Sequence, residues 1–498
     1  MVKTLETDVV IIGSGTAGMY ALREVRRAGR KFLMIDHGPL GTVCARVGCM
    51  PSKVALHAAA NWQAALNLDK IGGSGMHHLQ LDGRRAWAAL RRQRDGFAHP
   101  TAARTRESAG EHLLEGRARF LAADHLAVEL NDGGHCEVKA RAIIIAVGSR
   151  PVVPAWLDDV RDHVITTDDL FELENLPESI GILGLGVIGL EMGLALARLG
   201  VTVTGIDVAG TIGGIVDPEI SARAIERLGR EFEMWLQTQT RLSRTSTGVM
   251  METDGGRRAE VKLLMAALGR CSNVDRLGLA DAGFIVDKNG VPAFDPHTMQ
   301  VGKLPVFIAG DANNSVPLMH EAGDEGLIAG FNASQLAADA SVRPQAFIRK
   351  TPLAIAFTDP DIVSVGARLS DLDADRTVIG AADGLSNGRS RVLHEPLSLL
   401  RVYVDKADGR LLGAAMLAAR GEHLAHLLAL AIERGETAAS LLEMPYYHPV
   451  VEEMLRGALQ NAVAQLGEAR CLPLGLRVLE SAEREQIQAP MRVAALSA

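Results

Sequence analysis

The sequence VVIIGSGTAG at positions 9–18 joins a short apolar run to a glycine-rich turn. The apolar run is typical of a buried strand, and the Gly-x-Gly-x-x-Gly spacing predicts a tight turn that opens a helix. A second apolar run at positions 32–35 ends at Asp36. In such a unit the backbone amides approach a pyrophosphate and the acid accepts a hydrogen bond from a ribose hydroxyl. The stretch therefore predicts a dinucleotide site, whose glycines are Gly13, Gly15 and Gly18.

The same pattern returns at positions 181–207. Asp207 follows Gly184 at the same distance in sequence as Asp36 follows Gly13. A lone motif of this kind is weak evidence, because tight packing of a helix on a strand also selects glycine. Recurrence of the whole pattern favours two dinucleotide sites over that alternative. No Lys or Arg follows Asp207 before Arg223, which favours NAD over NADP, since a 2′-phosphate requires a nearby cation. The glycines of this copy are Gly184, Gly186 and Gly189.

Three further apolar runs, at 141–147, 263–268 and 306–309, are each followed by a glycine, which predicts buried strands that stop at turns. After about position 350 strand-like segments at 401–404 and 411–416 alternate with a helical segment at 422–434. The sequence thus predicts an α/β protein with two Rossmann-like dinucleotide-binding domains and a C-terminal α+β domain. The expected boundaries are 1–149 for the first domain, 150–271 for the second, 272–347 for a return to the first, and 348–498 for the last.

Composition narrows the class of protein. The 498 residues are 47% hydrophobic and 22% charged, with a net charge of −8, which indicates a multidomain globular protein without affinity for nucleic acid or anionic lipid. The amino end lacks the features of a secretory signal, and the most apolar window, 180–196, contains Glu191 and several glycines. We therefore expect a cytoplasmic protein with no membrane or nucleic-acid partner. One basic cluster is expected to be a solvated helix face, namely Arg84, Arg85, Arg91, Arg92 and Arg94 around Trp87 and Leu90.

The segment GTVCARVGCMPSK at positions 41–53 contains two of the five cysteines, Cys44 and Cys49. In a regular helix, residues five apart have Cα atoms roughly 8–9 Å apart, whereas a disulfide needs at most about 7 Å. The two can bond only if the chain departs from a regular helix, and Gly48 permits that departure. Such a bond beside a helix start favours thiolate chemistry; a zinc site or two unrelated thiols are the alternatives. The other cysteines, expected to be buried or inert, are Cys136, Cys271 and Cys471.

Together these motifs resemble the class I pyridine nucleotide-disulfide oxidoreductases, the family of the dihydrolipoamide dehydrogenases, glutathione reductases and mercuric reductases. The resemblance covers essentially the whole chain. It implies FAD and NAD as cofactors, Cys44 as the thiol that faces the substrate, and Cys49 as the charge-transfer thiol against the flavin. It also implies that Lys53 lies near the flavin and pairs with Glu191 under the nicotinamide. The alternative for these last two is a surface lysine and a glutamate that complements a helix dipole.

The segment HPVVEE at positions 448–453 resembles the family's His-Pro-Thr-x-x-Glu signature, with Val450 in place of the threonine and Tyr446 and Tyr447 before it. Histidine suits proton transfer near neutral pH, and a carboxylate five residues on can orient the ring and favour its charged form. The resemblance implies that His448, supported by Glu453, serves the redox site of the other subunit of a homodimer.

The resemblance assigns residues to two sets of roles. The expected catalytic residues are Cys44, Cys49, His448, Glu453, Lys53 and Glu191. The expected cofactor-binding residues are Gly13, Gly15, Gly18, Asp36, Gly41, Thr42, Lys53, Gly116, Ala146, Gly148, Ser149, Gly184, Gly186, Gly189, Asp207, Gly269, Arg270, Gly310, Asp311, Met319 and His320. Asp311 matches the acid that holds the ribitol chain of the flavin, and no metal site is expected.

The implied reaction passes electrons between a dithiol/disulfide substrate and NAD through a Cys44–Cys49 disulfide. Dihydrolipoamide on a lipoyl-bearing protein is the best match. Glutathione reductases need cations for NADPH, and mercuric reductases carry a vicinal cysteine pair near their end, where this chain has only Cys471. The alternatives are a reductase of another small, glutathione-like disulfide and a non-catalytic flavin- and NAD-binding sensor.

Overall fold

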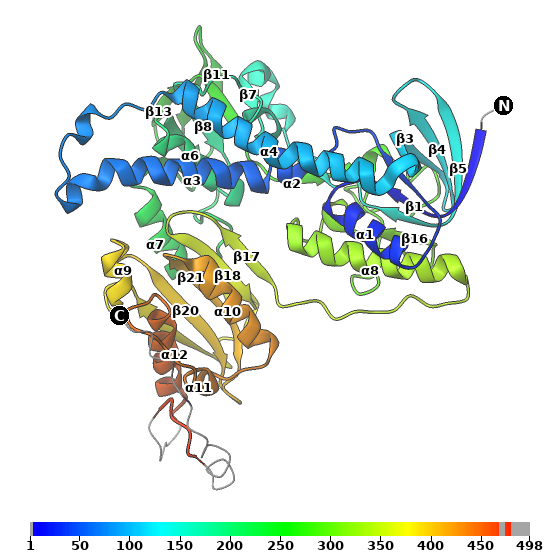
Figure 1. Cartoon of the computed structure of the whole chain (residues 1–498). Helices are drawn as coiled ribbons and strands as arrows, with labels where there is room; N and C mark the ends of the chain where they lie inside the picture. The colour runs from blue at the N-terminus through cyan, green and yellow to red at the C-terminus, as the bar shows by residue number, and fades with distance from the viewer. Residues whose placement is uncertain (1–2, 468–473, 480–498) are drawn as a thin grey trace, which may run out of the picture. The chain divides into compact units, whose positions relative to one another are not determined.

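The computed structural model describes residues 3–467 and 474–479, which form two compact units (Figure 1). The first unit contains the described residues up to Gly214 together with Ile225–Lys350 and Ala356–Thr358. The second contains Ile215–Ala224, Thr351–Ile355 and the described residues from Asp359 onward. Cys471 and most of the tail beyond Leu466 lie outside the described residues.

The first sheet of the first unit is built around β1, whose last four residues are fully or almost fully buried apolar side chains. Such a run suits a parallel strand covered on both faces. β1 pairs in parallel with β2 and β5, β16 extends the sheet beyond β5, and β3, β4 and β5 form an antiparallel meander. The strands are β1 (Lys3–Ile12), β2 (Phe32–Asp36), β3 (Leu113–Ala122), β4 (His125–Leu130), β5 (His135–Ile145) and β16 (Val306–Ile308).

Helices α1 (Thr16–Arg27) and α8 (Met319–Ala338) pack closely against each other on this sheet. A Cβ atom on Gly326 would lie 2.3 Å from the Ala17 carbonyl oxygen, and one on Gly330 would lie 2.6 Å from that of Ala21. The close approach of the two helices therefore requires glycine at these positions.

The second sheet of this unit is parallel throughout, in the order β10-β9-β8-β14-β7. Helix α6 (Val187–Arg198) follows β8, as α1 follows β1, so the two glycine motifs occupy equivalent places. These strands are β7 (Val164–Ile165), β8 (Ser179–Leu183), β9 (Thr202–Ile206), β10 (Glu233–Trp235) and β14 (Leu263–Ala266). The other elements are α5 (Thr167–Leu170), a pair β6 (Ser149–Pro151) and β15 (Arg270–Ser272), and an antiparallel sheet of β11 (Thr240–Arg244), β12 (Val249–Thr253) and β13 (Arg258–Val261). Helix α7 (Pro218–Leu228) begins in the second unit and ends in the first.

Three helices follow β2: α2 (Val43–Arg46), α3 (Cys49–Leu66) and α4 (Gly83–Ala109). The expectation of a basic face on α4 is correct for Arg84, Arg85 and Arg92, which are exposed over the buried Trp87 and Leu90. It is wrong for Arg94, which is only 5% exposed because backbone carbonyls and carboxylates surround its guanidinium.

The second unit contains a five-stranded sheet in the order β17-β18-β21-β20-β19. Buried side chains of helices α10 and α12 form one hydrophobic core with those of the sheet. The expected strands at 401–404 and 411–416 and the expected helix at 422–434 are confirmed. The elements are β17 (Leu353–Ala356), β18 (Asp361–Gly366), β19 (Thr377–Asp383), β20 (Leu399–Asp405), β21 (Leu411–Ala418), α9 (Gly388–Val392), α10 (Gly421–Glu433), α11 (Ala438–Leu441) and α12 (Glu453–Leu466). The fold class is therefore the predicted one.

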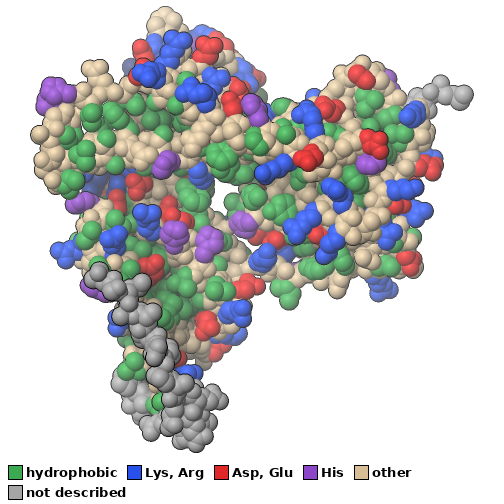
Figure 2. All heavy atoms as spheres, viewed as in Figure 1, with side chains coloured by type: hydrophobic (Ala, Val, Ile, Leu, Met, Phe, Trp, Pro, Cys, Tyr) green, Lys and Arg blue, Asp and Glu red, His purple; other side chains and the backbone are tan. Residues whose placement is uncertain are grey.

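Charges of both signs are interspersed over the face seen in Figure 2. Among the described residues, no helix combines the length and apolar character needed to cross a bilayer. Cys136 is buried and Cys271 half-buried.

Candidate functional site

The first glycine motif leaves open space where its helix begins. Gly15 caps the amino end of α1, and a Cβ atom there would meet nothing within 4 Å. Gly13 has a φ of +102°, and its Cβ would lie 2.3 Å from the carbonyl oxygen of Ala146, while a Cβ on Gly18 would lie 2.0 Å from that of Gly13. Gly13 and Gly18 are thus required by the backbone, and Gly15 leaves the helix amides accessible to a phosphate.

The second motif repeats this geometry around α6. Gly184 has a φ of +93° and a Cβ position 2.5 Å from the Ala267 carbonyl oxygen, and the Cβ of Gly189 would lie 1.9 Å from that of Gly184. Gly186 caps α6 with nothing within 4 Å of its Cβ position. Both sites therefore fit a dinucleotide pyrophosphate at a helix amino end.

The two predicted acids are held in the same way at the carboxyl ends of their strands. The carboxylate of Asp36 accepts from the Ser14 N–H at 2.7 Å and the Gly38 N–H at 2.7 Å. That of Asp207 accepts from the Leu185 N–H at 2.7 Å and the Ala209 N–H at 2.8 Å. Each acid is thus fixed against its own glycine turn, where a ribose would lie.

A polar cluster joins three of the predicted cofactor residues. The hydroxyl of Ser149 donates to Asp311 at 2.6 Å, and Arg270 donates to the hydroxyl and the carbonyl oxygen of Ser149, both at 2.7 Å. Arg270 also lies 3.8 Å from the Asp311 carboxylate. These residues come from β6, β15 and the turn after β16, so the fold brings together side chains more than 120 positions apart in sequence.

The remaining predicted cofactor residues lie in open turns, in a packed strand and at the exposed start of a helix. Gly148 and Gly269 have φ values of +65° and +92° at turns with open space around them. Gly116 lies in β3, where a Cβ atom would meet the Glu129 carbonyl oxygen at 2.4 Å, so strand packing alone accounts for this glycine. Met319 and His320 begin α8, and the Met319 side chain is 45% exposed.

Cys44 and Cys49 lie on either side of a break in the helical chain. Cys44 is in α2, the chain leaves helical geometry at Val47 and Gly48, and Cys49 is the first residue of α3. A Cβ atom on Gly48 would lie 3.1 Å from the Val43 carbonyl oxygen, so glycine permits this tight turn. The predicted departure from regular helix is therefore confirmed.

Both cysteines are thiols in this structure, and the Cys44 thiol donates a hydrogen bond to the Cys49 sulfur. That bond is the main cause that lowers the pKa of Cys49 to about 7, and the charge of Lys53 lowers it further. The same bond and burial raise the pKa of Cys44. In the reduced pair Cys49 is thus the more acidic partner. Among the described residues, no group of three or more His, Cys, Asp or Glu side chains could hold a metal ion.

Lys53 and Glu191 meet although 138 positions separate them. The Lys53 Nζ lies 2.9 and 2.8 Å from the two carboxylate oxygens of Glu191, which is only 3% exposed. Phe357 completes the group, because its N–H donates to Glu191 at 2.9 Å and its ring lies 4.6 Å from the ammonium. No sequence motif indicated the part played by Phe357.

In the second unit, the Nδ1 of His448 lies 3.1 Å from both carboxylate oxygens of Glu453, as the spacing predicted. The imidazole side chain is 76% exposed. Burial raises the pKa of Glu453, but hydrogen bonds from the His448 ring and the Val450 N–H lower it overall. The carboxylate therefore orients an accessible imidazole.

Two buried charged residues near these sites were not predicted. Arg94 donates to the carbonyl oxygen of Arg46, between the two cysteines, at 3.0 Å. Glu325, 3% exposed in α8, accepts from the Gly310 N–H and the Asn313 side chain, both at 2.7 Å, next to Asp311. Their partners are distant in sequence, so no spacing pattern could reveal them.

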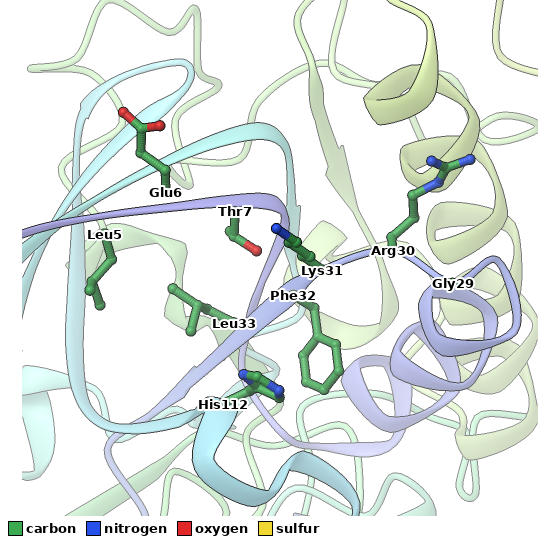
Figure 3. A pocket seen from close by; sticks show the side chains of 9 residues that line it. All are labelled: Leu5, Glu6, Thr7, Gly29, Arg30, Lys31, Phe32, Leu33 and His112. Carbon is green, nitrogen blue, oxygen red and sulfur yellow. The ribbon is translucent and has the colours of Figure 1, made fainter.

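A surface pocket lies between β1, the turn before β2, and His112 (Figure 3). Its lining residues from β1 come from the amino half of the strand, Leu5 to Thr7. The glycine motif follows the carboxyl end of that strand, where nucleotides bind in parallel sheets. The pocket is therefore separate from the dinucleotide site.

Comparisons with known proteins agree with this geometry. The family model "Pyridine nucleotide-disulphide oxidoreductase" matches residues 7–326, and its dimerisation domain matches residues 353–459, which supports a homodimer. A mercuric reductase of Streptomyces lividans is 29% identical over 93% of this chain and 98% of its own. The mitochondrial dihydrolipoyl dehydrogenase of Homo sapiens is 26% identical over 94% of this chain and 92% of its own.

Solved structures show the same fold. The HOCl-induced flavoprotein disulfide reductase RclA of Escherichia coli, as a Cu(II) complex, superposes with a TM-score of 0.77 at 21% identity, over 92% of this chain and 99% of its own. LpdA of Mycobacterium tuberculosis gives a TM-score of 0.77 at 20% identity, over 93% of this chain and all of its own. This chain belongs to the pyridine nucleotide-disulphide oxidoreductase family, enzymes that use FAD and NAD(P).

Proposed function

We propose that this enzyme oxidises a dithiol with NAD as the final electron acceptor, and that its substrate is dihydrolipoamide carried on a protein. The observation that carries the proposal is the pair Cys44 and Cys49, which face each other across the turn between α2 and α3. A thiolate at Cys49 near neutral pH, with Lys53 close by, suits electron transfer to a flavin.

FAD, when bound, would accept an electron pair from the reduced cysteines and pass a hydride to NAD. The glycines of the first motif, Asp36 and the cluster of Ser149 and Asp311 would hold it. Gly41, Thr42, Ala146, Gly148, Gly310, Met319 and His320 would line the same site. The second motif, Asp207, Gly269 and Arg270 would hold NAD. On this assignment, residues 1–149 and 272–347 form the flavin domain, 150–271 the NAD domain, and 348–498 the dimerisation domain.

The cysteine chemistry begins with the oxidised pair. His448 takes a proton from one substrate thiol, and the resulting thiolate attacks the Cys44 sulfur. A bond between Cys44 and the substrate forms, the Cys44–Cys49 bond breaks, and Cys49 leaves as a thiolate. The second substrate thiol then attacks the substrate sulfur of this mixed disulfide. The Cys44–substrate bond breaks as the substrate disulfide forms, and the proton of the second thiol passes to Cys44. The pair thus holds two electrons as one thiol and one thiolate, the form that the pKa directions of the two residues favour.

Dihydrolipoamide is supported by several relatives that are dihydrolipoyl dehydrogenases. NAD is supported at Asp207, whose carboxylate faces the glycine turn and is followed by Val208, 73% exposed, instead of a cation. A carboxylate at this position would repel a 2′-phosphate.

A second candidate is the reduction of a different small disulfide. It is favoured by the residues before His448, where Tyr447 is 81% exposed and would alter the entrance to the site.

Steady-state rates would test both candidates. We expect turnover with dihydrolipoamide and NAD to exceed that with glutathione disulfide and either NADH or NADPH by at least about a hundredfold in kcat/KM. A third assay with Hg(II) and NADPH covers the activity named for the Streptomyces relative. Activity confined to NADPH and glutathione disulfide, or to Hg(II), would refute the proposed substrate. A protein that binds FAD but shows no spectral change with dithiol or NADH would refute the enzymatic role.

A further inference from the structure

Arg94 is a buried cation in the middle of α4, with every nitrogen of its guanidinium engaged. Its Nη1 donates to the Arg46 carbonyl oxygen at 3.0 Å and to Glu172 at 2.9 Å. Its Nε donates to Asp95 at 2.7 Å, and its Nη2 to the Phe171 carbonyl oxygen at 3.3 Å. A buried charge is costly unless it is paired and hydrogen-bonded in this way. The arrangement therefore fixes the surrounding backbone closely.

The Arg46 carbonyl group belongs to the turn that sets the two cysteines against each other. Arg46 is the last residue of α2, and carbonyl groups at a helix carboxyl end lack a partner within the helix. The chain then leaves helical geometry at Val47 and Gly48 before α3 begins at Cys49. Arg94 therefore donates a hydrogen bond to this turn at Arg46, the residue two positions after Cys44.

The same face of α4 also contacts the beginning of the cysteine segment. Ala98 lies four positions after Arg94, on the same side of the helix. A Cβ atom on Gly41 would lie 3.0 Å from the Ala98 carbonyl oxygen, and Gly41 has a φ of +116°. Helix α4 thus contacts the cysteine segment at Gly41 and again at Arg46.

We propose that Arg94 is a positioning residue for the redox pair, because its bond to the Arg46 carbonyl oxygen holds the turn that lets Cys44 donate to Cys49. The inference rests on the redox role proposed above for the two cysteines. Arg94 touches neither sulfur and acts through the backbone. Through Phe171 and Glu172 it also ties this turn to the segment that leads from α5 toward β8.

The test compares Arg94→Met, which removes every donor, and Arg94→Lys, which keeps the charge and fewer donors. Arg92→Met on the exposed side of α4 is the matched control. Glu172→Gln weakens one ion pair and leaves the bond to Arg46 in place. The main measurement is the pH dependence of alkylation of the reduced enzyme by iodoacetamide, with peptide mapping at Cys49. FAD content, thermal midpoint and kcat are measured in parallel.

We expect Arg94→Met to shift the alkylation midpoint of Cys49 upward by about one pH unit, because the turn no longer holds the Cys44 donor in place. We expect kcat to fall roughly tenfold, with a smaller shift for Arg94→Lys and none for Arg92→Met or Glu172→Gln. A folded, flavin-loaded Arg94→Met with the wild-type profile overturns the inference. So does an unfolded Arg94→Met beside an Arg94→Lys of wild-type profile, which would show a structural role only. Because alkylation needs no dithiol substrate, a wild-type enzyme inactive with dihydrolipoamide would refute the proposed function and not this inference.

Discussion

Lys53 and Glu191 form a two-pronged ion pair, with the ammonium 2.9 and 2.8 Å from the two carboxylate oxygens of a glutamate that is 3% exposed. The lysine side chain keeps 34% of its surface exposed, so the pair joins a buried anion to a half-buried cation. A buried carboxylate that loses its cation is left with uncompensated charge. The stability of this part of the molecule thus depends on the two residues jointly.

We expect Lys53→Met to lower the free energy of unfolding by about 2 kcal/mol, because it leaves Glu191 with the Phe357 N–H as its remaining donor among the bonds described above. The double variant Lys53→Met/Glu191→Gln should recover part of that loss, since the neutral amide still accepts from Phe357. Urea unfolding of the four proteins in a double-mutant cycle measures the coupling. A double variant less stable than Lys53→Met would contradict the interpretation.

The second prediction concerns Cys49, whose pKa of about 7 depends mainly on the hydrogen bond from Cys44. Cys44→Ala removes the donor and should move the alkylation midpoint of Cys49 upward, toward the value of about 8.5 for a free cysteine. In the reduced wild type the folded pKa is below the unfolded one. The thiolate therefore contributes stability above about pH 8.5, and this contribution is lost as the pH falls through about 7.

Thermal midpoints of the reduced protein across pH 6 to 9, compared with those of Cys49→Ser, measure the effect on stability. The difference between the two proteins should grow as the pH rises. An alkylation midpoint that Cys44→Ala leaves unchanged would show that the thiol pair does not set the acidity of Cys49.

Local patterns in the sequence predicted the features of the fold that depend on neighbouring residues. The glycine motifs predicted both dinucleotide-binding folds of the first unit, because Gly13 and Gly184 have positive φ angles that glycine adopts most readily. The break between α2 and α3 followed from helix geometry and Gly48. Helical periodicity, in contrast, assigned Arg94 to solvent because it treats every arginine as polar. Its burial depends on carbonyl groups of Arg46 and Phe171, 48 and 77 positions away, which no local pattern encodes.

Glu325 supports the third prediction, because it holds the turn that carries Asp311. One oxygen accepts from the Gly310 N–H and the Asn313 side chain, and the other accepts from Arg349 at 3.0 Å. Glu325→Ala removes all three bonds, and we expect FAD affinity to fall at least about tenfold as the turn loosens. Arg349 also pairs with Glu321, which does not bond to this turn, so Glu321→Ala is the matched control. Flavin released on dialysis and the FAD dissociation constant are the measurements, and equal losses in the two variants would contradict the assignment.

Asp361 and Glu422 provide a prediction on the second unit. Burial and the hydrogen bond with Glu422 raise the pKa of Asp361 to about 9, whereas an unfolded aspartate has a pKa of about 3.9. Asp361 therefore keeps its proton in the folded protein at neutral pH. The stability from this proton is fully present below about pH 4 and is lost as the pH rises toward about 9.

We expect Asp361→Asn, which mimics the protonated acid, to be about as stable as the wild type at pH 4 and increasingly more stable as the pH rises to 9. Thermal midpoints at the two pH values check this, and Asp371→Asn serves as a control on an exposed acid of the same unit. If Asp361→Asn lost stability equally at both pH values, the carboxyl pair would not be sharing a proton.

His448 and Cys44 allow a test of where the proton carrier acts, because each can be removed from a different copy of the chain. The resemblance implies that His448 serves the cysteines of the partner subunit, and the match to the dimerisation domain supports a homodimer. We expect Cys44→Ser and His448→Gln homodimers to lose dithiol turnover, at least about a hundredfold for the histidine variant. Equimolar mixing after denaturation and refolding should produce about half heterodimers by random pairing. Each heterodimer then has one site with both cysteines and a histidine from the other copy, so activity should return to about a quarter of the wild type. If His448 acted on the cysteines of its own chain, every site in the mixture would lack one component, and no activity would return.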